Sequence, residues 1–192
     1  MRRSMSLAVI AAIALAAAAS FTGAARAAAP APAPILSGHF ELETLDGRTV
    51  TEADYRGKWM LVYFGYTYCP DVCPTVLNEM GTALNELGSL AARIQPIFIT
   101  VDPARDKPKV LTEYLKSFDP RIVGLYGDGD QTEAAAKEFH VYYRLRSLGN
   151  GQYTVDHSGF LYLLDPKGKF VKLLTADLPG HQMAAELRKA IR

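Results

Sequence analysis

Residues 59–74 of the chain read WMLVYFGYTYCPDVCP, and they carry the strongest structural signals of the sequence. Trp59–Phe64 is a continuous apolar and aromatic run, which is typical of a strand buried on both faces of a sheet. Pro74–Leu90 then carries apolar residues at helical spacing, with the proline well placed in a first turn. The stretch therefore predicts a buried strand, a loop that contains Cys69 and Cys73, and a helix.

The segments on either side extend the pattern. Further strands and helices alternate after the first helix, which predicts a parallel half of a sheet. Hairpins at both ends and a last helix predict an antiparallel half. We therefore expect an α/β, thioredoxin-like fold, with a central mixed sheet flanked by helices and an N-terminal β-hairpin. The predicted strands are 40–45, 94–101, 122–126, 142–146, 152–155, 160–164 and 169–174, and the predicted helices are 108–118, 131–139 and 179–191.

Composition and charge exclude several classes of protein. The chain has 192 residues, of which 49% are hydrophobic and 21% charged, and its formal net charge is +1. These values fit a globular protein and neither a disordered nor a fibrous chain. Residues 1–27 contain three arginines and no acid, so the remainder has 18 basic and 20 acidic side chains. No basic excess remains to neutralise phosphates, and we expect no nucleic acid partner.

Residues 1–27 are typical of an export segment. Two arginines near the start precede Leu7–Ala19, an apolar run of 13 residues, and small residues at Ala25–Ala27 offer a cleavage point. The run is short for a membrane span, which favours a cleaved signal peptide over an uncleaved N-terminal anchor. Residues 28–35 are rich in Ala and Pro and predict an extended tether.

The domain predicted for residues 36–192 is therefore expected outside the cytoplasm. We expect a periplasmic protein, either free or attached to the inner membrane through an uncleaved N-terminus. Thiols tend to be oxidised in such a compartment, so the two cysteines need a chemical reason.

The cysteine loop lies between the carboxyl end of a buried strand and the start of a helix. Ligands bind at this edge in open α/β sheets. Cys69 and Cys73 are four residues apart, so one helical turn would bring both sulfurs to one side, with Cα atoms about 6 Å apart. The helix N-terminus favours the thiolate form. Such a pair can hold a soft metal ion when reduced and form a disulfide bond when oxidised.

Other roles for two cysteines fit less well. A structural disulfide is the ordinary role in an exported protein, but a bridge across a five-residue loop constrains the unfolded chain little. A structural zinc ion usually takes four protein ligands, and the chain has only two cysteines to offer. Covalent haem attachment needs two residues between the cysteines and a histidine directly after them. Cu(I) binding and thiol–disulfide exchange remain as the matching chemistries.

His157 is the histidine predicted to complete a metal site. It lies just before the predicted strand Phe160–Leu164, and in a thioredoxin-like chain the loop entering that strand lies beside the dithiol loop. The other three histidines are predicted to be structural or solvated, namely His39, His140 and His181.

Further side chains near the same edge have weaker signals. Asp102 follows a buried strand, and its favoured interpretation is turn chemistry with an Arg–carboxylate pair, although a metal or catalytic role is an alternative. Tyr66 and Tyr68 are candidates for screening a metal from water. Gly127–Asp130 is predicted to be a solvated acidic loop.

Three segments together resemble a known family. FGYTYCPDVCP at 64–74, VDPARD at 101–106 and VDHSGFLYLLDP at 155–166 are similar to segments of the Sco/SenC family, named for synthesis of cytochrome c oxidase. The resemblance runs from about Leu36 to near the C-terminus. It implies a thioredoxin-like fold and a copper chaperone that is periplasmic or attached to a membrane.

The resemblance also implies the ligands and the partners. It assigns one copper ion, as Cu(I) or Cu(II), to Cys69, Cys73 and His157. The implied client is subunit II of cytochrome c oxidase with its copper A centre, and an upstream copper donor protein would load the site. Family members typically have a hydrophobic N-terminal anchor, whereas this leader is predicted to be cleaved.

A thiol–disulfide reductase is the rival hypothesis. Cys69 and Cys73 would then be the catalytic pair that keeps the copper-ligand cysteines of the oxidase reduced. Three residues separate these cysteines, in place of the two of a thioredoxin motif, and no proline directly precedes Phe160. Peroxide reduction is weaker still, because it leaves His157 without a task. We therefore expect a metallochaperone more than an enzyme.

Overall fold

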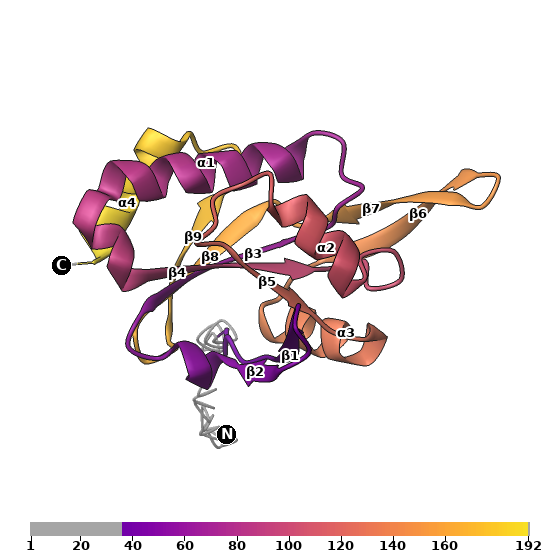
Figure 1. Cartoon of the computed structure of the whole chain (residues 1–192), viewed down its shortest axis with the longest axis horizontal. Helices are drawn as coiled ribbons and strands as arrows, with labels where there is room; N and C mark the ends of the chain where they lie inside the picture. The colour runs from indigo at the N-terminus through magenta and orange to yellow at the C-terminus, as the bar shows by residue number, and fades with distance from the viewer. Residues whose placement is uncertain (1–35, 192) are drawn as a thin grey trace, which may run out of the picture. The chain divides into compact units, whose positions relative to one another are not determined.

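The apolar run around Trp59 forms the centre of a sheet in the computed structural model, which describes residues 36–191 (Figure 1). Strand β3 (Trp59–Gly65) is buried along its whole length. It pairs in parallel with β4 (Ile94–Thr100) and antiparallel with β8 (Phe160–Leu164). The leader and tether predicted for residues 1–35 lie outside the described residues.

The sheet is mixed, as the sequence predicts. It has seven strands in the order β2-β1-β5-β4-β3-β8-β9, and a second sheet contains only β6 and β7. The described residues form one compact unit. No helix within residues 36–191 is long and apolar enough to span a membrane. The other strands are β1 (Glu41–Thr44), β2 (Thr49–Thr51), β5 (Val123–Tyr126), β6 (Tyr143–Gly149), β7 (Gln152–His157) and β9 (Phe170–Thr175), and the helices are α1 (Val72–Leu87), α2 (Pro108–Leu115), α3 (Gly129–Glu138) and α4 (Gly180–Ala190).

The two faces of β3 have different neighbours, because successive side chains of a strand alternate between faces. On one face, the ring of Phe64 packs edge-on against Phe139, which directly follows α3, with ring centroids 5.1 Å apart. On the other face, the hydroxyl of Tyr63 contacts the sulfur of Cys73 in α1. Helix α4 runs alongside α1 (Figure 1). The cysteine-bearing helix is therefore packed on the Tyr63 face of the sheet.

The β6–β7 hairpin extends away from the seven-stranded sheet (Figure 1). Its turn at Gly149-Asn150-Gly151 has positive φ at all three residues, which glycine and asparagine tolerate best. Most of β6 is exposed, whereas β7 ends at His157 close to the carboxyl end of β3. We call residues 143–157 the arm.

Two predicted elements need correction. Helix α1 begins at Val72 and not at Pro74, and it ends at Leu87, after which a 3-10 helix continues to Arg93. Proline is tolerated within the first turn because the first amides of a helix have no partner inside it. The prediction of a solvated loop at Gly127–Asp130 is correct in that Asp128 and Asp130 are exposed, but Gly129 and Asp130 already belong to α3. Asp128 caps α3 by accepting a hydrogen bond from the Gln131 amide, so the acidic stretch forms the start of a helix.

Candidate metal centre

The two cysteines occupy different positions at the start of α1. Cys73 is the second residue of the helix and fully buried, whereas Cys69 lies in the preceding loop and is half-buried. The amide of Cys73 donates a hydrogen bond to Cys69 Sγ over 3.3 Å. The expectation of one helical turn carrying both cysteines is therefore wrong, yet both sulfurs do lie on the same side. Both are free thiols.

His157 joins the two sulfurs, although it is 84 residues from Cys73. One ligand atom from each of Cys69, Cys73 and His157 lies within 4.8 Å of the others. Nε2 of His157 is 3.6 Å from Cys73 Sγ. Nδ1 lies 3.0 Å from the carbonyl oxygen of Ser158, which only accepts, so Nδ1 carries a proton and Nε2 is the ring nitrogen that faces the sulfurs. The structure thus brings the three predicted residues together with an imidazole nitrogen ready to bind a metal.

The electrostatics make the two thiols unequal. A hydrogen bond from the Cys73 thiol is the main reason that the pKa of Cys69 is lowered to about 4, and His157 and the backbone amides of Cys73 and Asp71 lower it further. The same hydrogen bond, together with burial, raises the pKa of Cys73 above its ordinary value. At neutral pH the pair is therefore a half-buried thiolate at Cys69 and a buried thiol at Cys73.

The floor of the site is made by Tyr63 and Gly65, which lie on the same face of β3. The Tyr63 hydroxyl donates a hydrogen bond to Cys73 Sγ over 3.5 Å. A Cβ at Gly65 would lie 3.1 Å from Cys73 Sγ and 2.8 Å from a ring carbon of Phe98, so a side chain there would push against the sulfur. Neither residue was predicted from the sequence to belong to the site. A glycine at the end of a buried strand pattern was the available signal for such a close approach.

The two tyrosines of the cysteine loop differ in their contacts. Tyr66 is buried, its ring packs edge-on against His157 with centroids 5.8 Å apart, and its hydroxyl lies 2.9 Å from Thr154 Oγ1 of β7. Tyr68 is 62% exposed and stacks on the guanidinium of Arg105. Tyr66 therefore packs on the imidazole ligand, whereas Tyr68 faces outward.

Asp102 lies outside the sulfur–imidazole cluster, where the favoured prediction placed it. It accepts hydrogen bonds from Arg105 Nε over 2.5 Å and from the Tyr153 hydroxyl over 2.8 Å. Arg105 also donates to the Tyr153 carbonyl oxygen over 2.9 Å, and its guanidinium stacks 3.7 Å from the centroid of the Tyr153 ring. The Asp102–Arg105 pair therefore fastens the arm to the body of the domain.

Asp106 has a separate role that sequence reasoning did not assign. It is fully buried and accepts hydrogen bonds from the Thr67 amide, the Thr67 hydroxyl and the Thr100 hydroxyl. Burial is the main reason that its pKa is raised, and these hydrogen bonds act in the opposite direction. Asp106 thereby fixes the cysteine loop to the carboxyl end of β4.

The remaining histidines lie away from the cluster. His39 is exposed and pairs with Glu52 at 2.7 Å, His140 follows α3 in a left-handed conformation, and His181 is exposed in the first turn of α4. Their predicted structural or solvated positions match the structure.

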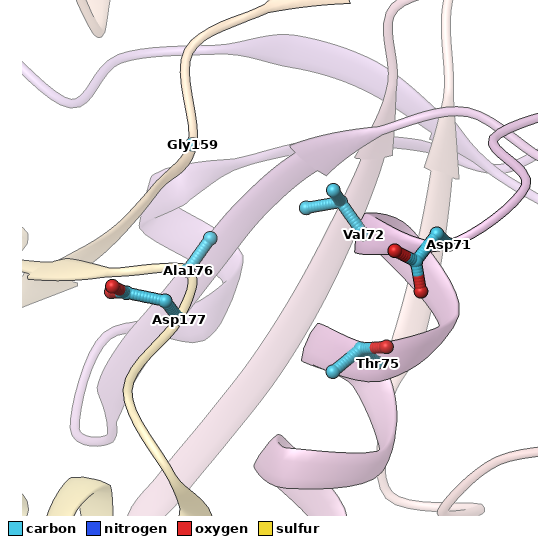
Figure 2. Close-up of a pocket in the computed structure, with 6 residues that line it drawn as sticks. All are labelled: Asp71, Val72, Thr75, Gly159, Ala176 and Asp177. Atoms are coloured by element: carbon cyan, nitrogen blue, oxygen red, sulfur yellow. The ribbon is translucent and has the colours of Figure 1, made fainter.

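The site opens to solvent on its Cys69 side. A cavity of about 250 Å³ is lined by Cys69, Val72 and His157 among others. A neighbouring cavity of about 370 Å³ lies between the first turn of α1, with Asp71, Val72 and Thr75, and the segments at Gly159 and Ala176-Asp177 (Figure 2). A partner molecule can therefore approach the sulfur of Cys69, while Cys73 stays covered.

Fold and site together define a thioredoxin-like protein whose dithiol and imidazole form a donor set for a soft metal ion. The profile of the SCO1/SenC family matches residues 28–192. The chain belongs to that family, as its three sequence segments predict.

Relatives of known sequence and structure support this assignment. Mitochondrial protein SCO1 of Saccharomyces cerevisiae is 47% identical over 142 residues, which cover 72% of this chain and 48% of that protein. Protein SenC of Rhodobacter capsulatus is 41% identical over 149 residues, which cover 78% and 67%. The chain spans about half the length of the curated relatives that it matches first.

Two solved structures with copper bound are similar to this domain. Yeast Sco1 with copper has a TM-score of 0.76 and 42% sequence identity, and the match covers 82% of this chain and 89% of that chain. ScoI of Bradyrhizobium japonicum with copper has a TM-score of 0.74 and 39% identity, and the match covers 80% and 98%. The thioredoxin-like prediction is confirmed.

Proposed function

We propose that this chain is a copper metallochaperone that binds one copper ion through Cys69, Cys73 and His157. The convergence of these three ligand atoms within 4.8 Å carries the proposal. Two sulfurs and one imidazole nitrogen suit Cu(I), which prefers soft ligands. The relatives whose structures were solved with copper bound support the same choice of metal.

The inequality of the two cysteines supports transfer as well as binding. Cys69 is half-buried, lies at the open side of the site and is a thiolate at neutral pH, whereas Cys73 is covered by the fold. A ligand of a partner protein would reach the ion beside Cys69 and replace one donor at a time. The ion would leave by ligand exchange, without unfolding of the chaperone.

The client that we propose is cytochrome c oxidase, at the copper A centre of its subunit II. Support comes from the family to which the chain belongs and from the resemblance of its motifs. We propose that this transfer takes place outside the cytoplasm, in agreement with the export segment predicted for residues 1–27, and that an upstream protein donates the copper.

Anaerobic titration of the reduced protein with Cu(I), against a competing chelator, tests the proposal. The wild type should bind one ion per chain, and Cys69→Ser and Cys73→Ser should each lose tight binding. His157→Ala should weaken Cu(II) binding markedly and leave the dithiol intact. His181→Ala removes an exposed histidine and serves as the control. Binding that is equally strong in all five proteins would refute the assignment of the site.

A thiol–disulfide reductase is the second candidate, favoured by the thiolate of Cys69 beside the buried thiol of Cys73. In this reaction the Cys69 thiolate attacks a client disulfide, and the first client sulfur leaves as a thiolate that takes the proton of the Cys73 thiol. The Cys73 thiolate then displaces the second client sulfur as a thiolate, and the Cys69–Cys73 disulfide forms. Rapid exchange with a disulfide peptide, combined with copper binding no better than that of the Cys69→Ser/Cys73→Ser double variant, would favour this candidate.

A further inference from the structure

The hydroxyl of Tyr63 is a buried polar group that the proposed function leaves without a role. Tyr63 is fully buried on the central strand β3. Within residues 36–191 its hydroxyl has a single hydrogen-bond partner, Cys73 Sγ, at 3.5 Å. A buried hydroxyl is costly unless it is hydrogen-bonded, so a tyrosine at this position, where a phenylalanine would fill the space, needs a reason.

The ring of Tyr63 also contacts His157, the imidazole ligand of the site. It packs edge-on against the imidazole of His157, with centroids 6.1 Å apart and planes at 64°. Phe98 lies on the same face with its centroid 6.2 Å away, and the missing side chain at Gly65 leaves the space that the Cys73 sulfur occupies. Tyr63 therefore lies beneath a sulfur ligand and an imidazole ligand at once, and its ring is held by its neighbours.

Copper binding changes what Cys73 needs from its surroundings. The cysteine must lose its proton to become a ligand, and it then places negative charge in an apolar core. A buried charge is stable only if it is paired and hydrogen-bonded. The metal provides the pairing from the open side of the site, and the Tyr63 hydroxyl is the side-chain donor that lies under the sulfur on the closed side.

We propose that Tyr63 is a positioning residue for copper binding, which fixes Cys73 Sγ through an O–H···S hydrogen bond and retains that bond when the sulfur is a metal-bound thiolate. This inference rests on the proposed copper function. A hydrogen bond to a ligand sulfur withdraws electron density from it, as partners of the ligands do in metal sites generally. Tyr63 therefore affects both the strength of binding and the electronic spectrum of the bound metal.

The substitution Tyr63→Phe keeps the ring and removes the donor, and Tyr162→Phe is the matched control. Tyr162 is also buried, on the neighbouring strand β8, but it packs against Phe64 and Phe139 on the opposite face. With Tyr63→Phe we expect Cu(I) affinity to fall about two- to tenfold, the worth of one hydrogen bond. We also expect the sulfur-to-Cu(II) charge-transfer band to move to longer wavelength. Tyr162→Phe should change neither quantity.

The outcomes separate the inference from the function. Unchanged affinity and an unchanged band in a folded Tyr63→Phe protein would overturn the role of Tyr63 and leave copper binding in place. Equal changes in both tyrosine variants would overturn it too, because they would report general loosening of the core. Failure of the wild type to bind copper would instead refute the proposed function, and this inference with it.

A measurement on the wild type decides the matter if Tyr63→Phe does not fold. In proton NMR of the Cu(I)-loaded chain, the Tyr63 hydroxyl proton should exchange slowly with water and show a close contact to the β protons of Cys73. Rapid exchange without that contact would overturn the proposed hydrogen bond.

Discussion

The sulfur side and the imidazole side of the candidate metal centre are built in opposite ways. Cys73 belongs to the core, with a helix around it and β3 beneath it. His157 belongs to the arm, residues 143–157, whose first strand is largely exposed and which pairs with no strand of the main sheet. Three side-chain links, from Tyr66 to Thr154, from Arg105 to Tyr153 and from Tyr153 to Asp102, hold the arm at the site.

This difference assigns separate tasks to the two sides. Burial of apolar side chains fixes the position of the sulfurs, and its free energy is shared with the whole domain. The position of the imidazole depends on the rings of Tyr63 and Tyr66, on the buried side chain of Val155 and on a few polar contacts with the arm. Each of these polar contacts is worth only about 0.5–1.5 kcal/mol. Changes in the core should therefore alter stability and the site together, whereas changes at the exposed positions of the arm should have little effect on the stability of the domain.

A leucine-to-alanine substitution, made once in the core and once in the arm, should give the largest difference in the free energy of unfolding. Leu161 is fully buried on β8 beside Tyr63, whereas Leu148 near the tip of the arm is 57% exposed. Leu161→Ala should lower the free energy of unfolding by about 2–5 kcal/mol through loss of burial and formation of a cavity. Leu148→Ala should change it by less than about 0.5 kcal/mol. Urea denaturation measures both, and similar losses would show that the arm is part of the cooperative core.

Gly65→Ala tests the floor of the site. The added methyl group would meet Phe98 and the Cys73 sulfur, so we expect a loss of about 1–3 kcal/mol in stability together with weaker copper binding. Gly129→Ala is the control, because a Cβ at the start of α3 meets nothing within 4 Å. Thermal unfolding and the chelator competition would be measured on both. Normal copper binding by Gly65→Ala would show that the sulfur has room to move.

The reactivity of Cys69 tests whether the two thiols of the site differ as their surroundings predict. Because the pKa of Cys69 is lowered to about 4, its thiolate persists as the pH falls from 8 to about 5 and is lost only as the pH approaches that value. The rate of alkylation of the copper-free protein should therefore be nearly flat from pH 8 to pH 5. An ordinary thiol, with a pKa of about 8.5, would slow roughly tenfold for each unit below neutrality. A profile that falls steeply below pH 8 would contradict a thiolate at Cys69.

Tyr66→Phe gives the smallest effect and tests one link of the arm. It removes the hydroxyl that lies 2.9 Å from Thr154 Oγ1 and keeps the ring on His157. We expect the free energy of local opening of the arm to fall by about 0.5–1.5 kcal/mol. Amide hydrogen exchange should then be faster in β7 and nearly unchanged in β3. Equal acceleration in both strands would mean that this bond supports the whole domain.

Local patterns were enough to predict much of the fold. The apolar run at Trp59–Phe64 predicted a central strand because a strand covered on both faces has no polar side, and β3 is such a strand. The start of α1 was misplaced because Pro74 is compatible with several positions of a first turn, and the sequence does not state which one it takes. The acidic stretch at the start of α3 was predicted only in part, because an exposed carboxylate that caps a helix cannot be told from one that is only solvated by composition.

The site was predictable where the chemistry of a residue type restricts its use. Few functions need two cysteines and one histidine at the edge of a sheet, and metal binding is one of them. The structure brings the three side chains together. The supporting residues were not predictable in the same way. Asp102 and Asp106 stand in one short motif, yet Asp102 fastens the arm and Asp106 fastens the cysteine loop. Tertiary contacts decide between such roles, and no local pattern records them.

The glycine on β3 beneath Cys73 has one more consequence. With no side chain at position 65, the thiol group fills a place in the interior that a methyl or larger group would otherwise occupy. The Cys73 sulfur is thus both a candidate metal ligand and part of the packed interior. Substitutions around this sulfur that are designed to change copper affinity will also change the packing of the interior. Stability and copper binding therefore need to be measured together for each variant.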